Sequence, residues 1–238
     1  NSPAYLAFDL MARVFSPYDL ALGPNPLERV LAESIDFARL AQAPMKLFIT
    51  ATNVRTGRPR VFRNAELSAN ALLASACLPA MFQAVEIDGE AYWDGGYSGN
   101  PTMSPLVAES DSDDTILVAI NPVQRPGIPR SAREILDRLN EVSFNAVLLK
   151  ELRMMALLRK VAATSDAEAA HWARMRLHLI SSPMLVDLGA SSKLNAEWAF
   201  LQLLRDEGRR AADAFFSAHG ADIGRRSTLD IDRLLEGV

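Results

Sequence analysis

Short β-branched apolar runs alternate with longer amphipathic segments along this chain. Residues 46–54 (Lys-Leu-Phe-Ile-Thr-Ala-Thr-Asn-Val) are apolar on both faces, as is typical of a buried strand in a parallel sheet. Further strands are expected at 59–63, 114–121 and 174–180. Because helical segments separate the strands, the pattern favours an α/β fold with a parallel sheet.

The N-terminal part of the chain carries clear helix-start signals. Residues 1–45 have apolar positions at helical spacing, and Asn25-Pro26 has the form of a cap followed by a first-turn proline. Ser68 is expected to cap a helix of small residues over 69–77. These signals predict helices on both sides of the strand at 46–54.

Beyond the proline-containing connector at 122–129, the pattern becomes mainly helical. Long helices are expected over 131–163 and 194–219, the second either as one helix or as two that meet near Gly208. We therefore predict an α/β domain over 1–122 and a mainly helical extension over 123–238. The apolar face expected for the first long helix comprises Ile135, Leu139, Val142, Val147, Leu149, Leu152, Met155 and Leu158.

Composition excludes several classes of protein. The 238 residues are 49% hydrophobic and carry a net charge of -4, so nothing predicts a nucleic-acid partner. The longest apolar stretch, 71–82, is too short to span a membrane. Cys77 is the single cysteine, which excludes an internal disulfide and fits a reducing, cytoplasmic compartment. The chain begins at Asn1 without an export signal, so we expect it to be the middle of a longer protein.

A carboxylate followed by two glycines, Asp94-Gly95-Gly96, ends an extended run. Glycine lacks Cβ, so the chain can turn there and another group can approach the acid closely. The preceding Asp88-Gly89 has the form of an ordinary hairpin turn. From the residues alone, Asp94 is either a catalytic acid or a turn residue.

Other candidates for chemistry have simpler structural interpretations. His171, His178 and His219 lack the spacing of a zinc site, and Ser98 does not stand in a Gly-x-Ser-x-Gly elbow. The acidic run 109–114 is expected to be a solvated loop. No dinucleotide or phosphate-loop motif is present, so neither a cofactor nor a metal is expected.

Positive side chains cluster on the long helix predicted over 131–163. Such a cluster is either a solvated face or a contact with lipid headgroups at a membrane surface. The helical region could also mediate oligomers, and the sequence leaves these interpretations open. The clustered residues are Lys150, Arg153, Arg159 and Lys160.

Several segments together resemble a known family. They are 74–82 (Ala-Ser-Ala-Cys-Leu-Pro-Ala-Met-Phe), 87–96 (ending in Asp-Gly-Gly), Asn100-Pro101, and the flanking runs 49–57 and 118–122. In this combination they resemble the second half of patatin-like phospholipases. The tail, notably 191–195 and 198–208, is similar to an extension found in a bacterial branch of that family.

The resemblance implies hydrolysis of lipid esters or phospholipids by a Ser–Asp dyad that needs no histidine. Asp94 would be the catalytic acid that accepts the serine proton, and Gly95 and Gly96 would let the serine loop come within reach. Partial desolvation beside Tyr92 and Trp93 would raise the basicity of Asp94. The chain departs from the family because the glycine-rich oxyanion loop and the serine elbow are absent.

The sequence is therefore interpreted as the C-terminal portion of a patatin-like hydrolase, with no nucleophile in this chain. Its partners would be a lipid or ester substrate and the missing N-terminal segment, whose strands should neighbour residues 46–54. The chain alone is expected to be inactive. The alternative is a non-catalytic patatin-like module that binds lipid or protein.

Overall fold

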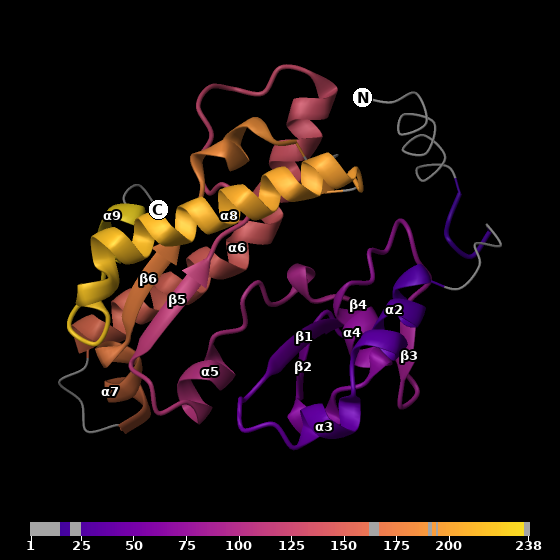
Figure 1. The fold of residues 1–238 in the computed structure, drawn as a ribbon, viewed down its shortest axis with the longest axis horizontal. Coiled ribbons are helices and arrows are strands. Elements are labelled where there is room, and N and C mark those ends of the chain that lie inside the picture. Colours follow the sequence, from indigo (N-terminus) through magenta and orange to yellow (C-terminus); the bar gives the residue numbers. More distant parts are fainter. Residues whose placement is uncertain (1–14, 20–24, 162–166, 190–191, 194, 236–238) are drawn as a thin grey trace. The chain divides into compact units, whose positions relative to one another are not determined.

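The computed structural model describes residues 15–19, 25–161, 167–189, 192–193 and 195–235 (Figure 1). Packing divides the chain into two compact units, Asn1–Thr102 (unit 1) and Met103–Val238 (unit 2). This division concerns packing alone, so the domain boundary predicted after residue 122 stays a prediction. Of the region 1–45 that is expected to be helical, residues 1–14 and 20–24 lie outside the described residues.

Unit 1 contains a four-stranded antiparallel sheet in the order β2-β1-β4-β3. The strands are β1 (Phe48–Asn53), β2 (Pro59–Arg63), β3 (Val85–Ile87) and β4 (Glu90–Asp94). Two predictions for residues 46–54 are therefore wrong: that this strand pairs in parallel, and that its neighbours are strands missing from the chain. Strand β1 lies between β2 and β4 and is antiparallel to both. Burial on both faces marks an inner strand, but it carries no information about the direction of the neighbouring strands.

The helices of unit 1 begin at the predicted caps. The Asn25 side chain accepts a hydrogen bond from the Leu27 amide at 3.0 Å, and Ser68 accepts one from Ala71 at 3.2 Å. Asp36 caps a separate helix, so the helical segment that starts at Pro26 consists of two helices. The helical elements are α2 (Pro26–Ser34), α3 (Phe37–Ala41), η1 (Asn64–Glu66), α4 (Ala69–Ser75) and η2 (Gly95–Tyr97). The strands and helices of unit 1 share one core, which comprises Ala51, Phe62, Leu67, Ala71, Ala74 and Tyr92.

Unit 2 contains the parallel pairing that the sequence predicted. Strands β5 (Asp114–Val118) and β6 (Arg176–Ile180) pair in parallel, with Asp114 opposite Arg176. The chain is therefore a mixed α/β protein with a helical C-terminal region, as predicted. The other elements are α5 (Ser104–Glu109), α6 (Ala132–Val161), α7 (Ala167–Arg174), η3 (Pro183–Asp187), α8 (Trp198–His219), η5 (Gly220–Asp222) and α9 (Ile231–Leu234).

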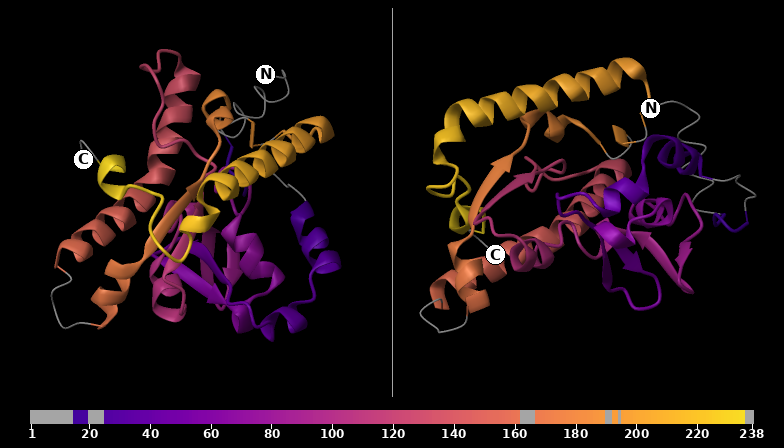
Figure 2. Two further views of the ribbon diagram at one scale, coloured as in Figure 1. Left: turned by 60° about the vertical axis from the view of Figure 1, so that its left-hand side comes forward. Right: turned by 60° about the horizontal axis from the view of Figure 1, so that its bottom comes forward.

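The two faces of the β5–β6 pair carry different side chains. Leu177 is fully buried in one cluster with Leu152 and Met155 of α6. The next residue, His178, packs edge-to-face on Phe215 of α8. Since successive side chains of a strand point to opposite faces, the pair lies between α6 and α8 (Figure 2). In the part of the chain that the structure describes, no helix is apolar over a membrane-spanning length.

The long helix α6 confirms part of the predicted face, at Leu152 and Met155, and its other buried positions lie elsewhere. Its buried positions are Glu141, Asn145, Leu148, Leu152 and Met155. Three residues of the predicted face, Ile135, Leu139 and Val142, are instead 43–57% exposed. The helix carries two stripes, and the buried one includes polar residues because Glu141 and Asn145 find partners that hydrophobicity alone cannot reveal.

Candidate active site

Asp94 is the last residue of β4, and its backbone is held from two sides. Its register partner is Ala51 of β1, and its amide donates to the Cys77 carbonyl at 2.8 Å. The carboxylate accepts the Gly96 amide at 2.7 Å and thereby caps η2. The half-buried side chain is thus placed by a strand, a helix end and a tight turn together.

A pair of hydroxyl groups fixes the peptide that follows Asp94. The Thr52 hydroxyl, on β1, donates to the Asp94 carbonyl at 2.8 Å. The Ser98 hydroxyl lies 2.8 Å from the Thr52 oxygen, and it is the donor because Thr52 has already used its one proton. Thr52 is only 6% exposed. Sequence reasoning missed it, although a buried polar residue within an apolar strand was the available signal.

Gly95 allows η2 to lie directly against β1. A Cβ at this position would lie 2.0 Å from the Thr50 carbonyl oxygen and 2.6 Å from its carbon. Only glycine fits there without moving the backbone. Gly95 is therefore needed for the packing of unit 1, while the access for a serine loop predicted for Gly95 and Gly96 stays a prediction.

The negative charge of Asp94 influences two neighbouring acids. Burial, with a contribution from Asp94, raises the pKa of the Cys77 thiol. Burial and then Asp94 also raise the pKa of the Tyr97 phenol, which is 51% exposed. Cys77 is 1% exposed and its sulfur contacts the Gln83 carbonyl at 3.2 Å. Asp94 therefore stands beside two acids whose raised pKa values keep them neutral near pH 7.

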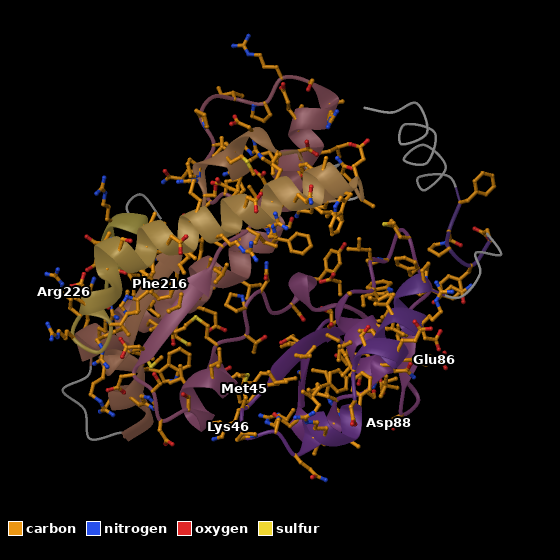
Figure 3. All side chains as sticks on the ribbon, viewed as in Figure 1. Met45, Lys46, Glu86, Asp88, Phe216 and Arg226 are labelled. Carbon is orange, nitrogen blue, oxygen red and sulfur yellow. The ribbon has the colours of Figure 1, made fainter. Side chains whose placement is uncertain are left out.

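Asp88 provides an internal comparison for Asp94. It lies at the β3–β4 turn (Figure 3), with φ at 54°, and Gly89 follows with φ at 76°. Two successive left-handed residues form the tight turn typical of two-residue hairpins. The prediction of an ordinary turn at Asp88 is confirmed. Asp88 is exposed, whereas Asp94 is half-buried.

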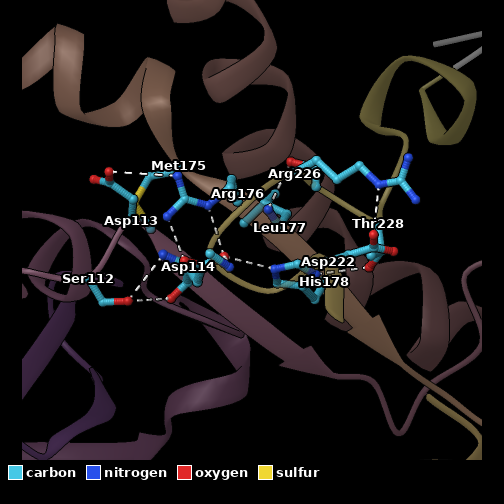
Figure 4. A network of polar contacts seen from close by, with 12 residues as sticks. Ser112, Asp113, Asp114, Met175, Arg176, Leu177, His178, Asp222, Arg226 and Thr228 are labelled. Carbon is cyan, nitrogen blue, oxygen red and sulfur yellow. Dashed lines mark hydrogen bonds and ion pairs between the residues drawn. The ribbon is translucent and has the colours of Figure 1, made fainter. Parts of the chain in front are cut away.

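All three histidines lie beside carboxylates in unit 2. His171 lies 3.5 Å from Asp113, and His219 lies 3.3 Å from Asp222. His178 is fully buried, with its ring nitrogens 3.0 Å from the Thr228 hydroxyl and 3.1 Å from Asp114 (Figure 4). No set of three or more acid, histidine or cysteine side chains in the described ranges is placed to hold a metal.

Thr228, His178 and Asp114 form a chain of polar contacts that holds two parts of unit 2 together. Arg176 donates to both oxygens of Asp114, at 3.0 and 2.6 Å, and holds the pKa of that acid well below its usual range. The Gly224 amide also donates to Asp114, at 2.9 Å. The group therefore fastens the segment after α8 to the sheet. The solvated loop predicted for the acidic run is wrong at Asp114, because its partners lie too far along the sequence to be read locally.

The four basic residues predicted to cluster on α6 differ in their exposure to solvent. Arg159 is half-buried and donates to the Met175 carbonyl, and burial lowers the pKa of its guanidinium. Lys150, Arg153 and Lys160 are exposed. Arg159 thus helps hold α6 to the residues before β6, and contact of this helix with lipid headgroups stays a prediction.

A comparison with known proteins finds a family to which this region is similar. Residues 10–107 match the family described as patatin-like phospholipase. The matched segment includes all four strands of the unit 1 sheet and the Asp94 turn. No curated protein matches the chain. The tail segments 191–195 and 198–208 lie beyond the matched residues, so the similarity to a bacterial branch of the family stays a prediction. Over residues 10–107, this chain is therefore similar to the patatin-like phospholipases.

Proposed function

We propose that this chain supplies the acid of a serine acyl hydrolase that acts on lipid esters. The observation that carries the proposal is the placement of Asp94 within the family-matched region. Its carboxylate leaves the end of β4, and contacts from Thr52 and Gly96 hold the turn in one geometry. A positioned base of this kind is what a hydroxyl nucleophile requires.

In the proposed reaction, Asp94 accepts the proton of a serine hydroxyl as the oxygen attacks the ester carbonyl. The tetrahedral intermediate collapses, and the leaving alcohol takes the proton back from Asp94. Water then repeats the sequence on the acyl-enzyme: Asp94 takes its proton, and the serine regains one as the fatty acid leaves. The serine and the oxyanion donors would come from sequence upstream of Asn1, since no serine elbow occurs in the 238 residues.

Carboxylates are intrinsically weak bases, so the position of Asp94 must compensate. The close packing of Gly95 against Thr50 and the hydroxyl pair of Thr52 and Ser98 restrict how far the turn can move. Fixed geometry converts a weak base into an effective one because proton transfer then needs little reorganisation.

The proposal is tested in the polypeptide extended upstream by its own coding sequence. Asp94→Asn keeps the shape of the side chain and removes the base, so ester hydrolysis should fall by roughly 10³ or more. The matched control is Asp88→Asn, in the same sheet, where the left-handed φ of 54° suits asparagine. Hydrolysis of a p-nitrophenyl ester should be unchanged by that substitution.

Equal activity of the Asp94→Asn and Asp88→Asn proteins would contradict the proposal. If the extended polypeptide also lacked a reactive serine, the non-catalytic lipid- or protein-binding module would be the correct alternative. In that protein Asp94 would serve only to cap η2 through the Gly96 amide.

A further inference from the structure

Unit 2 contains a half-open cavity of about 390 Å³. The volume falls in the usual range for small-molecule sites. All of its lining residues belong to unit 2, and most are apolar. The floor and walls include Leu117, Leu148, Leu152, Leu179, Val186 and Leu229.

The segments that flank the cavity are fastened to α6 by polar side chains. Asn145 donates to the Pro122 carbonyl at 3.0 Å, and Arg138 donates to the Val123 carbonyl at 3.0 Å. Pro122 and Val123 both line the cavity. Since Asn145 is only 6% exposed, water competes little for its bond, and this wall is held in place.

A second lining segment is fastened by Arg125. Its guanidinium donates to both oxygens of Glu141 at 2.8 Å, to the Leu188 carbonyl at 2.7 Å, and to the carbonyl of Val186, which lines the cavity. Glu141 is 8% exposed. Because both walls are fixed by paired polar groups, the cavity is preorganised for a ligand, which lowers the entropic cost of binding.

A cation stands at the rim of this apolar cavity. The Lys193 ammonium donates to the side-chain oxygen of Asn121, a lining residue, at 2.9 Å. Its nitrogen also lies 5.3 Å from the centre of the Phe144 ring. Among the residues that the structure describes, no carboxylate lies within ion-pair distance of Lys193. Lys193 is exposed, so it can turn toward an anionic group at the opening.

The acid at another part of the rim is already neutralised. Ser182 lines the cavity and donates to Glu207. Glu207 in turn accepts two hydrogen bonds from Arg210, at 2.7 and 2.6 Å. Of the two charged groups joined to lining residues, Glu207 and Lys193, only Lys193 has no oppositely charged partner among the described residues, and it favours a ligand with an anionic end.

We propose that this cavity binds one long-chain fatty acid, with the hydrocarbon tail against the leucine walls and the carboxylate beside Lys193. An apolar interior with a cation at its opening matches a single-chain amphiphile with one negative end. This site is made by unit 2 and does not depend on whether Asp94 is catalytic. If both proposals hold, the ligand is also the acid that ester hydrolysis releases.

The first test fills the cavity. The fluorescent long-chain fatty acid cis-parinaric acid is titrated into the whole chain and into its Ala119→Phe and Ile120→Phe variants, and its fluorescence reports binding. Ala119 lines the cavity, while its neighbour Ile120 does not and is 69% exposed. The Ala119→Phe substitution should weaken binding at least about tenfold, and Ile120→Phe should leave it unchanged. Absence of saturable binding by the parent chain, or equal affinity of both variants, would overturn the proposal.

The second test addresses the carboxylate and does not require a cavity substitution to fold. Lys193→Gln should weaken binding of the fatty acid several-fold and leave binding of its methyl ester unchanged, because the ester carries no charge. The exposed Lys150 provides the matched control, and Lys150→Gln should affect neither ligand. Equal loss of the acid and the ester in Lys193→Gln would refute the proposed role of Lys193.

Discussion

Gly95→Ala should be among the most damaging single-methyl substitutions in unit 1. The new Cβ would lie 2.0 Å from the Thr50 carbonyl oxygen, whereas real Cβ contacts essentially never fall under 3.0 Å. Relief needs a separation of about 1 Å between η2 and β1, because neither atom belongs to a flexible side chain. Such a movement also strains the hydrogen bond from Thr52 to the Asp94 carbonyl.

The expected cost combines two effects. Overpacking of a close contact costs about 1–3 kcal/mol, and a weakened buried hydrogen bond adds about 1 kcal/mol. We therefore expect the free energy of unfolding to fall by roughly 2–4 kcal/mol. Urea denaturation followed by tryptophan fluorescence measures this change, since Trp93 lies in β4 beside the turn.

Gly57→Ala separates steric overlap from backbone strain. Gly57 has φ at 68°, and a Cβ there would meet nothing within 4 Å. Its substitution should cost only the left-handed penalty of roughly 1–2 kcal/mol. If Gly95→Ala unfolded at the same urea concentration as the parent, the close approach of η2 to β1 would be refuted.

Three further predictions concern stability and activity. Asp114→Asn should lower the free energy of unfolding by about 2 kcal/mol, since it weakens charge-assisted hydrogen bonds from Arg176. Because Arg176 depresses the pKa of Asp114 in the folded state, the stabilisation by Asp114 is present above about pH 4 and is lost as the pH falls further. If the free energy of unfolding fell with pH at the same slope in Asp114→Asn as in the parent, this would be contradicted. Gly208→Ala, within α8 and with nothing within 4 Å of the added Cβ, should raise the melting temperature through a gain of about 1 kcal/mol, and a lowered melting temperature would refute it. The 238-residue chain alone should hydrolyse no p-nitrophenyl ester above the background rate, and turnover by the pure chain would overturn the assignment of the nucleophile to upstream sequence.

Local features of the fold could be read from the sequence because their causes are local. The turn at Asp88-Gly89 needs two left-handed residues, and the residue types supply them. Asn25 and Ser68 cap the helices that they precede. The position of Asp94 at a strand end likewise follows from the glycines after it.

Features that depend on distant partners could not be read in this way. The antiparallel pairing of β1 depends on which segments return beside it, and hydrophobicity does not encode that direction. The structural role of Asp114 depends on Arg176, which is 62 residues away. The buried stripe of α6 includes Glu141 because Arg125 compensates the buried charge. In each instance the residue could be identified from the sequence, but the distant residue or strand that it contacts could not.

The proposed role of Asp94 as a base is tested most directly by the reactivity of the serine that it would activate. In the upstream-extended polypeptide, the rate of labelling by a fluorophosphonate reports how readily the serine hydroxyl gives up its proton. We expect Asp94→Asn to slow labelling by roughly 10³ or more while Asp88→Asn labels at the parent rate. Labelling of the Asp94→Asn protein at the parent rate would show that Asp94 is not the base.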